Sequence, residues 1–168
     1  MKNVFLVCAI VASVISVVSC SKAPETSVTV ACINKPIQQD STALINFANA
    51  NNITVLKDVY GLYSQIITPG AGVTPTGSSI VQVTYKGTLL NGTVFDSTAT
   101  GATASFNLNQ LIPGWQIGIP KIKAGGRIKL LVPSALAYGC KGAKNAAGAF
   151  IIPENAPVYF DINLISVQ

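Results

Sequence analysis

Apolar and polar residues alternate along several stretches in the second half of the chain. Between residues 80 and 86, Val81, Val83 and Tyr85 occupy every second position, and polar residues stand between them. A period of two is typical of an antiparallel strand with one buried face. The Asn91–Gly92 pair, which lies between apolar flanks, predicts a tight turn. The same alternation predicts further strands at residues 62–67, 105–108, 127–132 and 158–167.

Two stretches have helical spacing instead. A helix is predicted at residues 38–50, with Asp40 or Ser41 as its N-cap. Its apolar stripe consists of Leu44, Ile45, Phe47 and Ala48. A second, brief helix is predicted at residues 112–119, with Pro113 in its first turn. We expect the stripe of the first helix to pack on the main domain, and binding of a partner is the alternative.

Several strands with one brief helix among them indicate an α+β fold, in which the helix lies on one face of an antiparallel sheet. The first helix is then an N-terminal addition to this sheet. A length of 168 residues suffices for one domain with a core and is too short for two of ordinary size.

The N-terminus has the pattern of a secretory signal: a basic start, an apolar run at residues 4–18, and small residues before a break. The run is shorter than the roughly 20 residues of a membrane-spanning helix. Val17-Val18-Ser19-Cys20 resembles the bacterial lipobox, which implies cleavage before Cys20 and a lipid on its thiol. An ordinary signal peptide and a transmembrane anchor are the alternatives. The expected division is a signal peptide at 1–19, a tether at 20–36, a helical extension at 37–59 and the main domain at 60–168.

Of the four cysteines, Cys8 leaves with the signal and Cys20 would carry the lipid, so Cys32 and Cys140 remain. In an oxidising compartment these two could form one disulfide. Two unrelated thiols are the alternative, because a sequence does not show whether the Cα atoms lie within bridging distance. A zinc site is not expected, since the chain has no histidine and the two cysteines form no close pair.

The composition excludes several classes of protein. With 49% apolar and 10% charged residues, the chain is not a disordered one. The absence of histidine excludes Ser-His-Asp and Cys-His triads, and no two acids have a clear catalytic spacing. The basic residues between positions 121 and 129 alternate with apolar residues and have no aromatic platform. They favour a solvated sheet face, and no nucleic-acid partner is expected.

A series of motifs follows in a fixed order across residues 60–168. They are Val83-Thr84-Tyr85-Lys86-Gly87, residues 91–97, Phe106-Asn107-Leu108, residues 111–119, Leu136-Ala137-Tyr138-Gly139, residues 151–156 and residues 158–164. In this order they resemble the FKBP-type peptidyl-prolyl cis/trans isomerases. The resemblance implies an antiparallel sheet of five to six strands that curves around one short helix.

The resemblance also implies a pocket with Trp115 as its floor. The residues that it implies to be catalytic are Tyr85, Phe95, Asp96, Ile112, Trp115, Tyr138 and Phe160. Those that it implies to bind substrate are Leu111, Ile152 and Phe106. The alternative for any one of these aromatic residues is a place in an ordinary core. Residues 98–102 contain no arginine where some family members pair one with the acid, so we expect Asp96 to be held differently.

The function that the resemblance implies is isomerisation of X-Pro bonds in exported proteins. The expected location is the cell envelope, with a lipid on Cys20 at a membrane that faces the periplasm or the cell exterior. The expected substrates are proline-containing polypeptides, macrolides are candidate inhibitors, and no cofactor is expected. The alternative is a peptide-binding or chaperone lipoprotein that uses the same pocket without turnover.

Overall fold

The computed structural model describes residues 31–168. The predicted signal segment and Cys20 lie outside the described residues. The α-helices are α1 (Ser41–Ala50) and α2 (Pro113–Gly118). The strands are β1 (Leu56–Lys57), β2 (Tyr63–Thr68), β3 (Ile80–Leu89), β4 (Val94–Ser97), β5 (Ala104–Asn107), β6 (Gly126–Val132), β7 (Ala143–Lys144), β8 (Phe150–Ile152) and β9 (Val158–Val167). Single 3₁₀ turns occur at Ile37–Asp40, Leu108–Gln110, Ile119–Lys121, Ser134–Leu136 and Gly139–Lys141.

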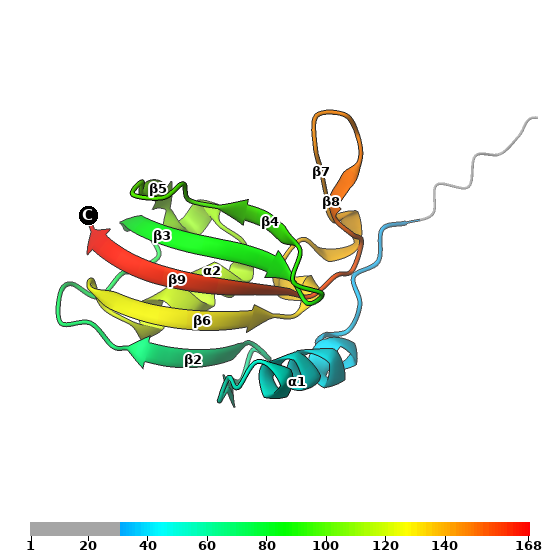
Figure 1. Cartoon of the computed structure of the whole chain (residues 1–168), viewed down its shortest axis with the longest axis horizontal. Coiled ribbons are helices and arrows are strands. Elements are labelled where there is room, and N and C mark those ends of the chain that lie inside the picture. Colours follow the sequence, from blue (N-terminus) through cyan, green and yellow to red (C-terminus); the bar gives the residue numbers. More distant parts are fainter. Residues whose placement is uncertain (1–30) are drawn as a thin grey trace, which may run out of the picture. The chain divides into compact units, whose positions relative to one another are not determined.

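The main sheet is antiparallel, with the order β1-β2-β6-β9-β3-β4, and β5 also pairs with β3 (Figure 1). The long strands β3 and β9 lie side by side at its centre, with Tyr85 opposite Ile162. This arrangement confirms the predicted α+β fold with a short helix on the sheet. The structure adds the two-residue edge strand β1, and a separate hairpin of β7 and β8.

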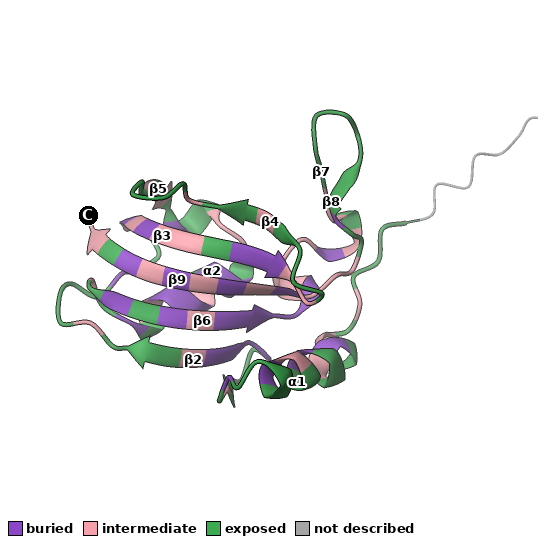
Figure 2. Ribbon diagram, viewed as in Figure 1, coloured by how far each residue is buried: buried purple, intermediate pink, exposed green. Residues whose placement is uncertain are grey.

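One face of the sheet packs against α2 and carries the main core. Trp115 and Ile119 are buried against Leu130, Phe160 and other side chains that alternate along β6 and β9. Gly118 allows this close approach, because a Cβ on it would lie 2.6 Å from a methyl carbon of Leu130. The burial pattern of β9 alternates along its length, as the period of two predicted (Figure 2).

The opposite face of the sheet packs against α1 near β2 and β6 (Figure 1). Leu44 and Ala48 are buried there against Tyr63 and Leu131, which confirms that the stripe of the first helix packs on the domain. The assignment of Ile45 to this stripe was wrong, because its side chain is 43% exposed. Leu131 follows Leu130 in β6, so the two successive leucines enter the two different cores.

Asp40 occupies the N-cap position of α1, as predicted, but its side chain makes no capping hydrogen bond. Its carboxylate is buried and accepts hydrogen bonds from the backbone N–H and the hydroxyl of Ser134, at 2.8 and 2.6 Å. Lys35 Nζ forms an ion pair with the other oxygen at 3.3 Å. The buried carboxylate of Asp40 therefore takes its hydrogen bonds from Ser134, which is far away in the sequence, and not from the backbone N–H groups of its own helix.

The segment before α1 is fastened to the loop between β6 and β9. Cys32 and Cys140 form a disulfide, with their Cα atoms 5.4 Å apart. Asn34 Oδ1 accepts a hydrogen bond from the Cys140 N–H at 2.9 Å, and Asn155 Oδ1 accepts one from the Lys35 N–H at 3.0 Å. The expected Cys32–Cys140 disulfide is thus confirmed, and the last residues of the predicted tether lie on the domain.

Within residues 31–168, no helix has the length and apolar character needed to cross a bilayer. The same part of the chain contains no cluster of three or more acidic, cysteine or histidine residues that could hold a metal ion.

Candidate functional site

A small cavity of about 110 Å³ lies between the sheet and the start of α2. Strands β3, β4, β5 and β9 supply part of its wall, and the rest comes from α2, the segment just before it and the loop after β6. It is lined by Tyr85, Asp96, Phe106, Leu111, Ile112, Trp115, Tyr138 and Phe160. All eight belong to the set of site residues that the sequence predicted, so the fold brings together residues that are far apart in the chain.

Trp115 lines the cavity from α2 and is only 4% exposed. Its ring meets those of Tyr85 and Phe160 edge to face, with centroids 5.2 Å apart in both pairs. Phe106 adds a third edge-to-face contact at 6.1 Å. Such pairs hold one another in fixed orientations. The indole Nε1 is buried and has no hydrogen-bond partner among the described residues. The floor is therefore rigid and apolar, with one unused donor.

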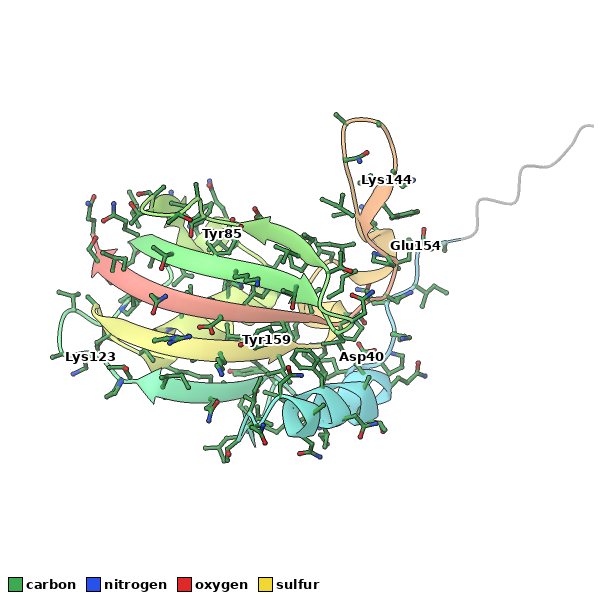
Figure 3. All side chains as sticks on the ribbon, in the orientation of Figure 1. Asp40, Tyr85, Lys123, Lys144, Glu154 and Tyr159 are labelled. Atoms are coloured by element: carbon green, nitrogen blue, oxygen red, sulfur yellow. A yellow bond between two sulfur atoms is a disulfide. The ribbon has the colours of Figure 1, made fainter. Side chains whose placement is uncertain are left out.

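Tyr85 and Asp96 form the polar part of the rim. Tyr85 lies on β3 (Figure 3), and its hydroxyl donates a hydrogen bond of 2.6 Å to Asp96 Oδ2, on β4. Burial raises the pKa of the Tyr85 hydroxyl well above 10.0, and the bond to the Asp96 carboxylate raises it further. Thr98 fixes the backbone of Tyr85, since its Oγ1 accepts from the Tyr85 N–H at 3.1 Å. Here a tyrosine hydroxyl holds the acid, in agreement with the expectation that Asp96 is held differently.

Tyr138 lies on the opposite side of the cavity, in the loop that follows β6. Its pKa is raised, first by burial and then by the nearby charge of Asp96. The hydroxyl is therefore neutral at physiological pH and can donate a hydrogen bond to a carbonyl oxygen. Its ring contacts that of Phe95 edge to face, with centroids 6.0 Å apart.

Two predicted site residues, Phe95 and Ile152, do not line the cavity. Phe95 packs edge to face against Phe160, with ring centroids 5.5 Å apart, and so supports a ring that lines the cavity. Ile152 is 1% exposed and belongs to the main core. Gly87 makes room for the rings, because a Cβ there would lie 2.7 Å from Phe95 and 2.8 Å from Phe160.

The sequence did not single out Gln116, which positions the segment before α2. Its side-chain amide donates to the carbonyl oxygens of Leu111, at 2.6 Å, and Asn109, at 3.2 Å. These bonds hold the backbone that carries Leu111 and Ile112. Within residues 31–168, the Ile112 N–H donates to no protein acceptor. Nothing in the local sequence distinguishes Gln116 from an ordinary polar residue on the outer face of a helix.

The arrangement suits binding of a small apolar group more than bond-breaking chemistry. Its walls are aromatic and aliphatic, and its polar groups are two hydroxyls, one carboxylate and a free backbone N–H. The lining residues include no serine, threonine, cysteine, lysine or histidine. The fold and the cavity therefore define an α+β protein with a pocket that can enclose a small apolar ring or side chain and has a few polar groups at its rim.

Residues 72–165 match the sequence profile of the FKBP-type peptidyl-prolyl cis-trans isomerase family. The chain belongs to this family. The match covers β3 to β9 and so includes every residue that lines the cavity.

Several curated relatives, FkpA among them, carry the same family name. FkpA of Escherichia coli K12, an FKBP-type peptidyl-prolyl cis-trans isomerase, is 43% identical over 109 residues, which are 64% of this chain and 38% of that protein. The outer membrane protein MIP of Legionella longbeachae is 38% identical over 140 residues, which are 80% of this chain and 57% of that one. The chain thus spans about two fifths to three fifths of the length of these relatives.

Solved structures show the same fold. The crystal structure of FkpA from Escherichia coli matches 79% of this chain and 62% of its own, with a TM-score of 0.65 and 36% identity. The crystal structure of AtFKBP13 matches 68% of this chain and 99% of its own, with a TM-score of 0.62 and 31% identity.

Proposed function

We propose that this protein is a peptidyl-prolyl cis/trans isomerase that acts on proline-containing polypeptides. The observation that carries the proposal is the cavity floored by Trp115, with Asp96 and Tyr138 at its rim. Its walls fit an apolar ring, and its few polar atoms stand where the carbonyls on either side of such a ring would lie. Membership of the isomerase family supports the same activity.

The chemistry requires no proton transfer and no broken bond. An amide resists rotation because of its partial double-bond character, with a barrier of about 18–20 kcal/mol. In the twisted state the nitrogen loses conjugation and the carbonyl loses its charge-separated form. An apolar cavity disfavours the polar planar state relative to the twisted one, and a wall shaped to the twisted state lowers the barrier further.

The polar groups of the rim then have positioning and electrostatic roles. The free N–H of Ile112 and the hydroxyl of Tyr138 bind substrate carbonyls and hold the ends of the X-Pro unit. Asp96 places its charge beside the twisted amide, and its bond to Tyr85 fixes the carboxylate. Both tyrosine hydroxyls have a raised pKa, so neither acts as a base at neutral pH.

A protease-coupled assay on X-Pro peptides tests the activity, with Asp96→Ala as the variant. We expect kcat/KM to fall about tenfold or more, because a hydrogen bond to a charged group contributes roughly 1.5–3 kcal/mol. Asp161→Ala is the matched control. Asp161 is also bonded to a side chain, by two contacts from Arg127 at 2.8 and 2.9 Å, but it does not line the cavity.

Rates at background level with the purified protein would refute the enzymatic function and leave only peptide binding. An unchanged kcat/KM in Asp96→Ala, with a loss in Asp161→Ala, would place the site elsewhere. A macrolide is proposed to compete for the cavity and to inhibit wild-type turnover.

We also propose that the protein is held at a membrane of the cell envelope through a lipid on Cys20. The lipobox-like sequence supports this location, and so does the disulfide, since such bonds persist in oxidising compartments. One relative is named an outer membrane protein. We expect Cys20→Ala to move the protein from the membrane fraction to the soluble fraction on cell fractionation. Tight membrane attachment of this variant would contradict the lipid anchor.

A further inference from the structure

A second, larger cavity of about 370 Å³ lies beside the first and has no role in the function proposed above. Three parts of the chain line it, one of which is Pro113 at the start of α2. Cys32 and Asn34 come from the segment before α1, and Cys140 and Lys141 come from the loop after β6. The disulfide and the bond from the Cys140 N–H to Asn34 Oδ1 join these two parts. The cavity thus exists because the N-terminal segment is fastened to this loop.

The two cavities are neighbours, because Tyr138 lines both of them. Pro113 of the second cavity follows Ile112 of the first directly in the chain. A polypeptide seated with its apolar ring over Trp115 therefore passes Tyr138 and reaches the second cavity within a few residues. The occupant that this adjacency indicates is the flanking part of the same substrate chain.

The lining of the second cavity is mixed, and its polar groups are hydrogen-bond donors. Lys141 is exposed and supplies a positive charge, and no acidic side chain lines the cavity. Asn34 uses its Oδ1 as an acceptor for Cys140, so its amide Nδ2 is free to donate in the part of the chain that the structure describes. A cavity lined by hydrogen-bond donors and one cation, with no acidic side chain, favours binding of a carboxylate.

We propose that the second cavity is an extended substrate subsite that binds residues flanking the X-Pro bond and prefers an acidic side chain there. This inference rests on the proposed isomerase function and names a specificity determinant for it. Lys141 contacts the carboxylate of the substrate, and the disulfide-linked segment from Cys32 to Asn34 forms the wall.

Paired peptides that share one X-Pro core test this subsite. They carry glutamate or lysine at the second to fourth positions on either side of the core, and a short peptide without flanks is the reference. With wild-type protein, we expect kcat/KM to be about twofold to fivefold higher for glutamate than for lysine on one side of the core, as for exposed charge pairs. Lys141→Glu should invert this ratio.

Lys144→Glu is the matched control, because Lys144 is an exposed cation of the same loop that lies over the Phe150 ring, 4.4 Å from its centroid, and outside the cavity lining (Figure 3). It should keep the wild-type ratio. An equal ratio in wild type and Lys141→Glu would overturn the subsite, as would a ratio that changes equally in both variants. The short peptide separates the two proposals, since background turnover of this peptide by wild-type protein refutes the isomerase function itself.

The Cys32→Ser/Cys140→Ser variant tests the wall, since loss of the disulfide releases the N-terminal segment. The ratio of kcat/KM for the glutamate peptide to that for the lysine peptide should then fall toward one. If the preference stays at the wild-type value, the segment does not form the subsite. Amide shifts of Asn34 and Lys141 on titration with the glutamate peptide give a second readout that does not depend on turnover, and no shift at either residue would also overturn the proposal.

Discussion

At the scale of single residues, the site combines a rigid apolar floor with very few polar atoms. Trp115 contacts three other rings edge to face, and each contact restricts its motion. The polar atoms of the rim are held by neighbours: Tyr85 holds Asp96, and Gln116 holds the backbone before Ile112. Because these groups are already held in place, little binding free energy is lost in ordering the site when a substrate binds.

The titration of two tyrosines predicts how stability depends on alkaline pH. Burial, followed by bonds and charges of nearby carboxylates, raises the pKa of Tyr85 and Tyr159 above the ordinary 10.0. The unfolded chain therefore loses these protons before the folded chain does. The resulting stabilisation is complete below about pH 10 and is lost as the pH rises through the folded-state values.

Urea unfolding at a series of pH values between about 8 and 11 measures this effect. We expect the free energy of unfolding to decline above about pH 10, and to decline less steeply in Tyr85→Phe. Tyr60→Phe is the control, because Tyr60 is 61% exposed and lies on a turn. Identical pH profiles for wild type and Tyr85→Phe would contradict the coupling.

At the scale of elements, the extension at residues 37–59 is part of the folded domain. α1 buries Leu44 and Ala48 on the face of the sheet opposite to α2. Just before α1, Asp40 bonds to Ser134, at the start of the turn that leads to Tyr138. The extension therefore supports the loop that supplies one wall of the cavity.

The Asp40–Ser134 contact predicts a large loss of stability in Asp40→Ala. The substitution leaves the N–H and hydroxyl of Ser134, both buried, without their acceptor. We expect the free energy of unfolding to fall by about 3 kcal/mol, as for a lost partner of a buried charged group. A double-mutant cycle with Ser134→Ala, measured by urea unfolding, separates this contact from other effects of each substitution. Additive losses in the cycle would show that the two residues are not coupled.

At the scale of the whole molecule, the described residues form one unit from Ala31 to Gln168. The disulfide links its first residues to a loop 108 positions further along the chain. It closes most of the domain into a single covalent loop and holds the N-terminal segment beside the two cavities. The stability of the domain and the shape of the proposed subsite therefore depend on the same bond.

Removal of this disulfide should lower the free energy of unfolding by about 4 kcal/mol, because a closed loop of this length restricts the unfolded chain. Urea unfolding of Cys32→Ser/Cys140→Ser and of wild type, each with and without reductant, measures the loss. Reductant should shift the midpoint of wild type and leave that of the double variant unchanged. Equal midpoints for oxidised wild type and the double variant would contradict the prediction.

The local pattern of the sequence determined the elements. Alternation of apolar and polar residues predicted β3, β6 and β9, because the two faces of a strand meet different surroundings at every second position. The order of motifs along residues 60–168 predicted the eight residues that line the cavity. The same order also included Phe95 and Ile152, because a motif does not distinguish a ring that lines a cavity from one that supports it.

The tertiary structure alone decided which distant groups meet. The partner of Asp40 lies 94 positions away, so a local reading assigned this acid to its own helix. Two leucines in succession, Leu130 and Leu131, enter two different cores, and only the position of α1 explains why both are apolar. The second cavity likewise depends on contacts between segments that are far apart in the sequence. The physical reason is that local periodicity reflects the surroundings of one segment, whereas a buried charge or a cavity between segments depends on how the whole chain closes on itself.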